Sequence, residues 1–185
     1  MSDGSDFLRR LVALLDRAQI PHMVAGSFAS TLHGTPRSTQ DIDLVIDPSG
    51  QALLAFVAGL APGDYYASDD AAQDALRRRS QFNVIDMATG WKADLIVRKE
   101  RPYSVEEFRR RKPERILGVE VFVATPEDTI LTKLEWAAMS GSERQLRDVT
   151  GILDVKREEL DRAYIERWAQ DLGVLDAWRR LDRPE

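Results

Sequence analysis

The segment that most constrains the fold is 41–47, DIDLVID, in which two aspartates are set into an otherwise apolar run. Side chains alternate between the two faces of a β-strand, so Asp41 and Asp43 share one face while the intervening aliphatic residues point to the other. The apolar face has to be buried against a core. The segment therefore predicts a half-buried strand that holds two carboxylates side by side.

Two adjacent carboxylates repel each other and lose hydration unless a cation lies between them. Hard oxygen ligands suit Mg²⁺, which usually binds one or two protein carboxylates and keeps its other positions for water and phosphate oxygens. Asp41 and Asp43 are therefore predicted to bind a divalent metal ion. The alternative, a polar pair on the solvated face of an edge strand, is disfavoured by the apolar residues at 42 and 44–46.

Upstream of this strand, a short apolar run at 22–26 ends in Gly26-Ser27, and 27–32 has the composition of a helix. A glycine turn that leads into a helix presents backbone N–H groups to an anion. Taken alone, Ser27 is better explained as a helix cap. With the aspartate pair downstream, the two parts together indicate a phosphoryl-transfer site.

The rest of the chain divides into segments by hydrophobic periodicity and by Gly and Pro breaks. Helices are expected at 6–18, 27–32, 51–60, 68–79, 104–111, 125–139, 143–153, 158–172 and 174–181, and strands at 22–26, 41–47, 81–87, 92–97, 114–117 and 120–123. The helix at 104–111 is expected to begin with a capping box of Ser104 and Glu107. This order predicts an α+β fold, with a small mixed β-sheet flanked by helices and a C-terminal helical bundle. We expect an α/β core at residues 1–124 and a helical subdomain at residues 125–185.

Composition excludes several kinds of site. The 185 residues contain no cysteine, which rules out disulfides, thiolate catalysis and a cysteine-based zinc site. Two histidines, His22 and His33, are too few for an imidazole-rich metal site. The N-terminal stretch does not have the pattern of a signal peptide and no apolar run approaches the length of a membrane span, so we expect a cytoplasmic protein with no membrane partner.

The net charge of −5 argues against broad, non-specific binding to nucleic acid, which depends on neutralising phosphates. Positive charge is nevertheless concentrated at 77–79, 98–101 and 109–112. Most such clusters are solvated helix ends. These clusters could instead form a local basic patch beside the acidic centre.

Gly26-Ser27, a short helix and then Asp41-x-Asp43 in a strand form an ordered set that resembles the nucleotidyltransferase superfamily related to DNA polymerase beta. Asp94, in WKADLIV, matches the third carboxylate that such enzymes carry on a later strand. Each motif alone carries little information, whereas all of them in order, on the expected elements, are fairly specific.

The closest likeness is to minimal bacterial nucleotidyltransferase-like proteins, including the AbiEii-type toxin family, and it covers residues 24–153. These proteins carry R-x-T-x-D-I-D-L before the core strand, a lysine on a later helix, and then R-x-x-R-D. The residues that match are Arg37, Thr39, Lys133, Arg144, Arg147 and Asp148.

The resemblance implies a Mg²⁺-dependent nucleotidyltransferase that transfers NMP from an NTP to a hydroxyl group, with loss of pyrophosphate. Asp41, Asp43 and Asp94 would hold two metal ions, or Asp94 would act as general base on the attacking hydroxyl. Gly26 and Ser27 would bind the terminal phosphates through backbone N–H groups and the serine hydroxyl.

Other matched residues would complete the phosphate site. Arg37 and Thr39 lie in the loop before the aspartate pair, where the guanidinium could clamp a phosphate with two hydrogen bonds, the alternative being an ordinary exposed loop arginine. Lys133 would face a phosphate as a mobile point charge, the alternative being an ordinary exposed helix lysine. Asp148 would orient Lys133 or the nearby arginines, or would form only a helix pair with Arg144.

Three further residues are open to more than one interpretation. Asp86 competes with Asp94 because it lies on the other arm of the same expected hairpin, and Asp94 is preferred because DLIV matches the third-carboxylate strand. Asp47, next to Pro48, is expected to end its strand rather than to bind metal. Trp91, at the expected hairpin tip, is a candidate for contact with a nucleotide base.

Two other functional classes are compatible with parts of the sequence. The first is a catalytically silent nucleotide- or RNA-binding module, as half of a toxin–antitoxin pair with a cognate antitoxin as partner. The second, a metal-dependent phosphohydrolase, is disfavoured by the lack of histidines and of a second acidic cluster. The sequence does not specify the acceptor, which in this superfamily includes tRNA, protein hydroxyls and small molecules such as aminoglycosides.

Overall fold

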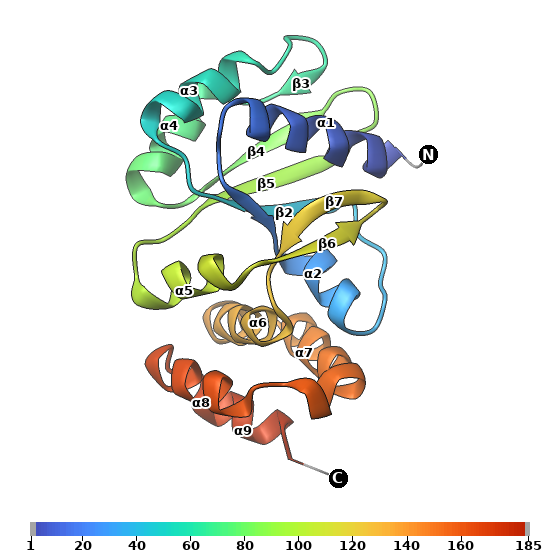
Figure 1. The fold of residues 1–185 in the computed structure, drawn as a ribbon, viewed down its shortest axis with the longest axis vertical. Helices are drawn as coiled ribbons and strands as arrows, with labels where there is room; N and C mark the ends of the chain where they lie inside the picture. The colour runs from blue at the N-terminus through green and yellow to red at the C-terminus, as the bar shows by residue number, and fades with distance from the viewer. Residues whose placement is uncertain (1–2, 184–185) are drawn as a thin grey trace.

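The strands form one seven-stranded mixed sheet in the computed structural model, which describes residues 3–183 (Figure 1). Their order is β3 (Tyr65–Tyr66), β4 (Gln81–Asp86), β5 (Lys92–Val97), β2 (Asp41–Ile46), β1 (His22–Val24), β7 (Val119–Val123) and β6 (Lys112–Ile116). The pairs β2–β5 and β1–β7 are parallel, and the remaining pairs are antiparallel. The predicted α+β fold with a mixed sheet is confirmed, and the short strand β3 was not expected.

Alternation along the central strands separates an apolar face from a polar one. In β2, Ile42, Leu44 and Ile46 are fully buried, while Asp41 and Asp43 lie on the opposite face. The neighbouring strand β5 repeats the pattern with a buried set of aliphatic residues, Ala93, Leu95 and Val97. This is the period-two pattern that the sequence predicted.

Three helices cover the apolar face of the sheet: α1 (Asp3–Arg17), α3 (Gly50–Ala58) and α4 (Asp69–Arg78) (Figure 1). The helix α1 contributes Phe7 and Leu11 to the main core, α3 contributes Phe56, and α4 contributes Ala72 and Ala75. On the other side, Phe108 of α5 (Pro102–Arg110) packs against Val45 of β2. The helix α5 leaves part of the polar face uncovered, and the site lies there.

A second core holds the C-terminal helices together. It is built from α6 (Pro126–Ser140), α7 (Glu143–Lys156), α8 (Arg162–Asp171) and α9 (Leu175–Leu181), and it buries Trp168 and Trp178. Tyr103 of α5 also belongs to this core, although it lies on the N-terminal side of the predicted boundary at residues 124/125. That boundary stays a prediction. Nowhere in residues 3–183 is a helix both long and apolar enough to cross a bilayer.

One expected helix is divided in two. The segment 158–172 was expected to be continuous, but a short 3₁₀ turn, η1 (Arg157–Glu159), is followed by a break before α8. The Asp161 side chain accepts a hydrogen bond from the backbone N–H of Tyr164 and caps α8. An aspartate in this position satisfies a free N–H of a new helix rather than continuing an old one.

The helix α2 (Gly26–His33) packs against both α6 and α7. A Cβ atom on Gly34, just after α2, would lie 2.7 Å from the backbone of Gly151 in α7. Two glycines therefore allow the chain to approach α7 closely. The packing of α2 against both helices holds the N-terminal turn of α2, at Gly26, in a fixed position relative to them.

The capping box expected at Ser104 and Glu107 is wrong. The helix α5 begins earlier, at Pro102, and Ser104 accepts a hydrogen bond from Arg101 Nε at 3.0 Å. Glu107 is buried against α6, where its Oε1 accepts a hydrogen bond from Thr132 at 3.0 Å. Packing between helices outweighs the local capping preference here.

Candidate active site

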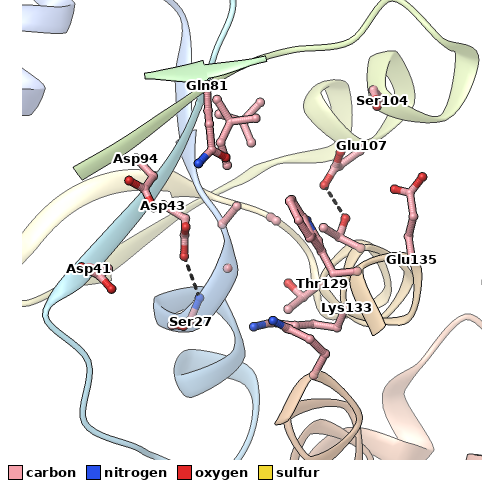
Figure 2. Close-up of a pocket in the computed structure, with 18 of the residues that line it drawn as sticks. Ser27, Asp41, Asp43, Gln81, Asp94, Ser104, Glu107, Thr129, Lys133 and Glu135 are labelled. Carbon is pink, nitrogen blue, oxygen red and sulfur yellow. Dashed lines mark hydrogen bonds between the residues drawn. The ribbon is translucent and has the colours of Figure 1, made fainter. Parts of the chain in front are cut away.

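Eight of the nine predicted site residues line one cavity of about 350 Å³, between the polar face of the sheet and the helices α5 and α6 (Figure 2). The eight are Gly26, Ser27, Arg37, Thr39, Asp41, Asp43, Asp94 and Lys133. The ninth, Asp148, does not line the cavity. The cavity has the size of a typical small-molecule site.

Asp43 and Asp94 are neighbours across the parallel strands β2 and β5. The register pairs Asp43 with Asp94 and Asp41 with Lys92. Figure 2 shows the three aspartates together on one side of the cavity. Burial raises the pKa of Asp43, the backbone N–H of Ser27 lowers it, and the charge of Asp94 raises it further; the net pKa lies above its ordinary value. A nearby cation would stabilise the ionised carboxylate and lower this pKa.

Asp86, the competing carboxylate, lies on the opposite face of the sheet. It shares the buried face of β4 with Phe82. Its carboxylate accepts hydrogen bonds from Arg10 Nη2 at 2.9 Å and from Thr89 Oγ1 at 2.7 Å. Asp86 is therefore a partner of α1, which favours Asp94 as the third carboxylate.

Gly26 makes room for Asp43. Its φ is +55°, and a Cβ atom there would lie 1.9 Å from Asp43 Oδ2. The backbone N–H of Ser27 donates to the same oxygen at 3.2 Å, and the Ser27 hydroxyl accepts a hydrogen bond from Arg37 Nη2. The groups expected to bind phosphate are thus engaged by the chain itself, and a phosphate would have to replace these contacts.

Lys133 and Arg37 are held by one carboxylate. Lys133 is only 4% exposed, and its Nζ donates to Asp148 Oδ2 at 2.6 Å. Arg37 Nε donates to Asp148 Oδ1 at 3.1 Å. Burial raises the pKa of Asp148, but Lys133 and Arg37 outweigh this effect and hold it below its ordinary value. Asp148 therefore fixes two cations beside the cavity, whereas Arg147 is exposed and pairs with Glu143 at 3.8 Å.

Asp41, Asp43 and Asp94 are suitable ligands for a metal ion, but their oxygens are not arranged around one common point. Asp94 Oδ1 is buried without a hydrogen-bond partner, so it is an unsatisfied acceptor. Among residues 3–183, no group of three His, Cys, Asp or Glu side chains could hold a metal ion as it stands. Lys92 Nζ instead lies 3.2 Å from Asp94 Oδ2 and 3.6 Å from Asp41 Oδ1. Oxygen ligands on two rigid strands and one unsatisfied oxygen fit Mg²⁺.

Comparisons with known proteins identify the fold. No protein-family model and no curated protein matches this chain. Among solved structures, the antibiotic-resistance factor ANT(2'')-Ia is similar with a TM-score of 0.58 and 14% identity, covering 95% of this chain and 96% of that one. An antigenic nucleotidyltransferase-like protein from Paracoccidioides brasiliensis is similar with a TM-score of 0.55 and 15% identity, covering 97% of this chain and 93% of that one. The chain has the nucleotidyltransferase fold.

A third structure with this fold is the lincosamide antibiotic adenylyltransferase LnuA in its lincomycin-bound form. It is similar with a TM-score of 0.55 and 12% identity, covering 84% of this chain and 98% of that one. At such low identity the likeness concerns the fold alone. The predicted nucleotidyltransferase architecture is confirmed, while the role of each site residue stays a prediction.

A second wall of the cavity faces the aspartates, and no motif in the sequence predicted that its residues belong to the site. Its polar members are Ser104, Glu107, Thr129, Thr132 and Glu135, from α5 and α6 (Figure 2). Glu135 is neutralised by Arg101, whose Nη2 donates to Glu135 Oε2 at 2.6 Å. No sequence motif marks these residues, because they come together only when α5 packs against α6.

Glu107 is the most perturbed group of this wall. Burial and the charge of Asp128 raise the pKa of Glu107 to about 8, although the hydrogen bond from Thr132 and the charge of Arg101 oppose the shift. At neutral pH the side chain is therefore mostly protonated. The wall carries a neutral hydrogen-bonding group at this position instead of a negative charge.

Replacing Glu107 should remove a pH dependence of stability. Its pKa rises from an ordinary value of 4.5 to about 8 on folding, so the folded state binds more protons between these values. The stabilising contribution is therefore complete below pH 4.5 and is lost as the pH rises through 8. Within this window, the unfolding free energy of the wild type should fall by about 1.4 kcal/mol per pH unit relative to Glu107→Gln.

Urea denaturation at a series of pH values within that window measures the difference between the two proteins. Glu106→Gln is the matched control, because Glu106 lies next in α5 but pairs with Arg109 at the surface. Its stability should run parallel to the wild type. The assignment fails if the Glu107→Gln curve also runs parallel to the wild type.

The position of Trp91 does not support it as the candidate for contact with a nucleotide base. The Trp91 ring packs against Gly4 of α1 and lies 6.4 Å from the ring of Phe28, away from the cavity. Trp136 of α6 lines the cavity instead and is 45% exposed. Trp136 is one turn after Lys133, so its position follows from the orientation of α6, which the sequence did not reveal.

Proposed function

We propose that the protein is a metal-dependent nucleotidyltransferase that transfers NMP from an NTP to a hydroxyl group of a small molecule. The observation that carries the proposal is the in-register pair Asp43 and Asp94 in a cavity that Lys133 and the Gly26-Ser27 turn also line. Phosphoryl transfer depends mainly on positioning and on charge stabilisation. Carboxylates on one wall and a buried cation on another meet both needs.

Two proteins with this fold support the reaction class. ANT(2'')-Ia is known in complex with adenylyl-2''-tobramycin, and LnuA is a lincosamide antibiotic adenylyltransferase. A small-molecule acceptor also agrees with the cavity of about 350 Å³ and with the net charge of −5, which disfavours long nucleic acids.

In the proposed reaction, the acceptor hydroxyl oxygen attacks the α-phosphorus, a new P–O bond forms, and the bond to the β-phosphate bridging oxygen breaks. Pyrophosphate leaves, and the hydroxyl proton passes to Asp94 and then to water. Lys133, Arg37 and the Ser27 N–H stabilise the terminal phosphates. A divalent ion at the aspartates would lower the pKa of the acceptor hydroxyl and neutralise charge on the phosphoryl oxygens.

The test is incubation of the protein with Mg²⁺ and each of the four α-labelled NTPs, in the presence of separated fractions of a cell lysate. Small molecules, RNA and protein are supplied as separate acceptor fractions, with aminoglycosides and lincosamides as defined acceptors. We expect label in the small-molecule fraction together with stoichiometric release of pyrophosphate.

Label in RNA or protein would overturn the acceptor class and leave nucleotidyl transfer in place. Saturable binding of NTP without pyrophosphate release in any fraction would overturn the enzymatic proposal and favour the catalytically silent alternative. A toxin–antitoxin role would then be tested through a cognate partner.

A further inference from the structure

Lys92 lies among the residues assigned to the metal. Its ammonium group donates a hydrogen bond to Asp94 Oδ2 at 3.2 Å and lies 3.6 Å from Asp41 Oδ1. The side chain is 32% exposed, whereas that of Asp94 is 16% exposed. A single cation thus reaches the first and the third carboxylate of the site from its more open side.

The fold itself places Lys92 there. Lys92 and Asp94 are two residues apart in β5, so both project from the polar face of the sheet. The register of β2 and β5 then sets Lys92 directly beside Asp41. The strand pairing therefore fixes the backbone of Lys92 beside Asp41, and the side chain reaches both carboxylates without any loop movement.

A lysine and a divalent ion cannot both remain close to the same oxygens. Two positive charges a few ångströms apart repel each other strongly in a partly buried site. The Lys92 side chain has an open route to water, because it is partly exposed and has a flexible four-carbon stem. Metal binding therefore has to displace the ammonium group from Asp41 and Asp94.

We propose that Lys92 is a built-in counter-cation that occupies the carboxylate site and competes with the divalent metal for it. The inference rests on the proposed function, because it assumes a metal at Asp41, Asp43 and Asp94. It assigns to Lys92 a role in metal binding that nothing in the D-x-D motif indicates. Lys92 neutralises the carboxylates before the metal arrives and lowers the affinity for free metal.

The competition also links metal binding to the nucleotide. A triphosphate brings several negative charges next to Asp41 and Asp94, and these offer the displaced ammonium group new partners. Free metal receives no such help. Lys92 should accordingly lower the affinity for free metal more than the affinity for metal that binds together with a triphosphate.

The test is a titration of the full-length protein with Mn²⁺, followed by the loss of the free-ion electron paramagnetic resonance signal, which does not depend on turnover. Lys92→Met removes the charge and should tighten free Mn²⁺ binding by about tenfold at low salt. Lys92→Arg keeps the charge and should bind Mn²⁺ like the wild type. In the presence of a non-hydrolysable ATP analogue, the difference between wild type and Lys92→Met should shrink.

Lys156→Met is the matched control. Lys156 pairs with Glu159 in the C-terminal part of the chain, away from the carboxylates, and its loss should leave Mn²⁺ affinity unchanged. If Lys92→Met fails to fold by circular dichroism, Lys92→Gln takes its place, since it keeps a hydrogen-bond donor without the charge.

The outcomes separate the inference from the proposed function. Equal Mn²⁺ affinities for wild type and Lys92→Met would overturn the role of Lys92 and leave a metal-dependent transferase intact. Weaker binding in Lys92→Met would also overturn it, because Lys92 would then support the metal. Absence of Mn²⁺ binding in every variant would overturn the proposed metal site itself.

Discussion

Asp43→Asn is expected to abolish nucleotidyl transfer, lowering the turnover rate by at least about a thousandfold, which corresponds to about 4 kcal/mol of activation free energy. Asp43 is paired with Asp94 in the strand register, is two residues from Asp41 in β2, and accepts a hydrogen bond from the backbone N–H of Ser27. The amide oxygen of asparagine can keep that hydrogen bond but supplies no charge to a metal ion. Label transfer in a single turnover measures the loss.

The fold should survive this substitution. Burial already raises the pKa of Asp43, so the ionised form is costly in the metal-free protein and a neutral amide of the same shape costs little. The thermal midpoint without metal should therefore be equal to that of the wild type or higher. The stabilisation that Mg²⁺ gives to the wild type should disappear.

Asp47→Asn is the matched control. Asp47 directly follows the same strand, but it does not line the cavity and pairs with Arg98 Nη2 at 2.9 Å. Its replacement should leave label transfer within about threefold of the wild type, because a partly exposed ion pair contributes little. Transfer by Asp43→Asn at the rate of the Asp47→Asn control would exclude Asp43 from the catalytic machinery.

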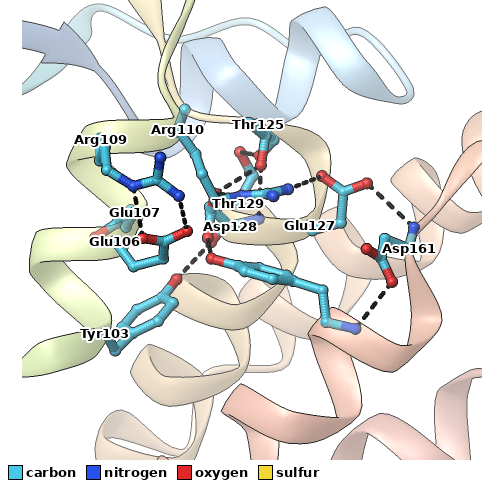
Figure 3. A network of polar contacts seen from close by, with 12 residues as sticks. Tyr103, Glu106, Glu107, Arg109, Arg110, Thr125, Glu127, Asp128, Thr129 and Asp161 are labelled. Carbon is cyan, nitrogen blue, oxygen red and sulfur yellow. Dashed lines mark hydrogen bonds and ion pairs between the residues drawn. The ribbon is translucent and has the colours of Figure 1, made fainter.

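Asp128→Ala is expected to lower the free energy of unfolding by about 3 kcal/mol. Asp128 is fully buried at the start of α6 (Figure 3). Its carboxylate accepts hydrogen bonds from Tyr164 Oη at 2.6 Å, Thr125 Oγ1 at 2.7 Å and Arg110 Nε at 3.2 Å. One side chain thus joins α5, α6 and α8, and alanine would leave three donors without this acceptor.

Denaturation by urea measures the effect of Asp128→Ala. Asp128→Asn should lose less, because its amide oxygen can still accept the hydrogen bond from Tyr164. The exposed Asp154 of α7 provides the control, and Asp154→Ala should change the unfolding free energy by no more than about 0.5 kcal/mol. A loss below about 1 kcal/mol for Asp128→Ala would mean that the network contributes little to the joint between these helices.

Several features of this protein followed from local sequence alone. The alternation in DIDLVID separated Asp41 and Asp43 from Ile42 and Leu44, and the structure has the same division. The start of the helix predicted at 125–139 also followed from local sequence, because proline at the first turn and a capping threonine act within one turn.

The two-residue period of the strands also separates other charged residues between the two faces of the sheet. In QFNVID, Asp86 has the same parity as the apolar residues, which indicated that it faces the core and not the cavity. In KADLIV, Lys92 has the same parity as Asp94, which placed a lysine on the carboxylate face. Both inferences needed only the two-residue period of a strand.

The sequence by itself determined which residues share a face of a strand and where most helices begin and end, since these depend on contacts within a few residues. Tertiary structure alone decided that Glu107 accepts a hydrogen bond from Thr132 instead of forming the expected capping box. It also decided that Trp136 rather than Trp91 lines the cavity, and that Lys92 lies beside Asp41. These outcomes depend on strand register and helix rotation. Register and rotation are set by packing between segments far apart in the chain, and no local pattern encodes that packing.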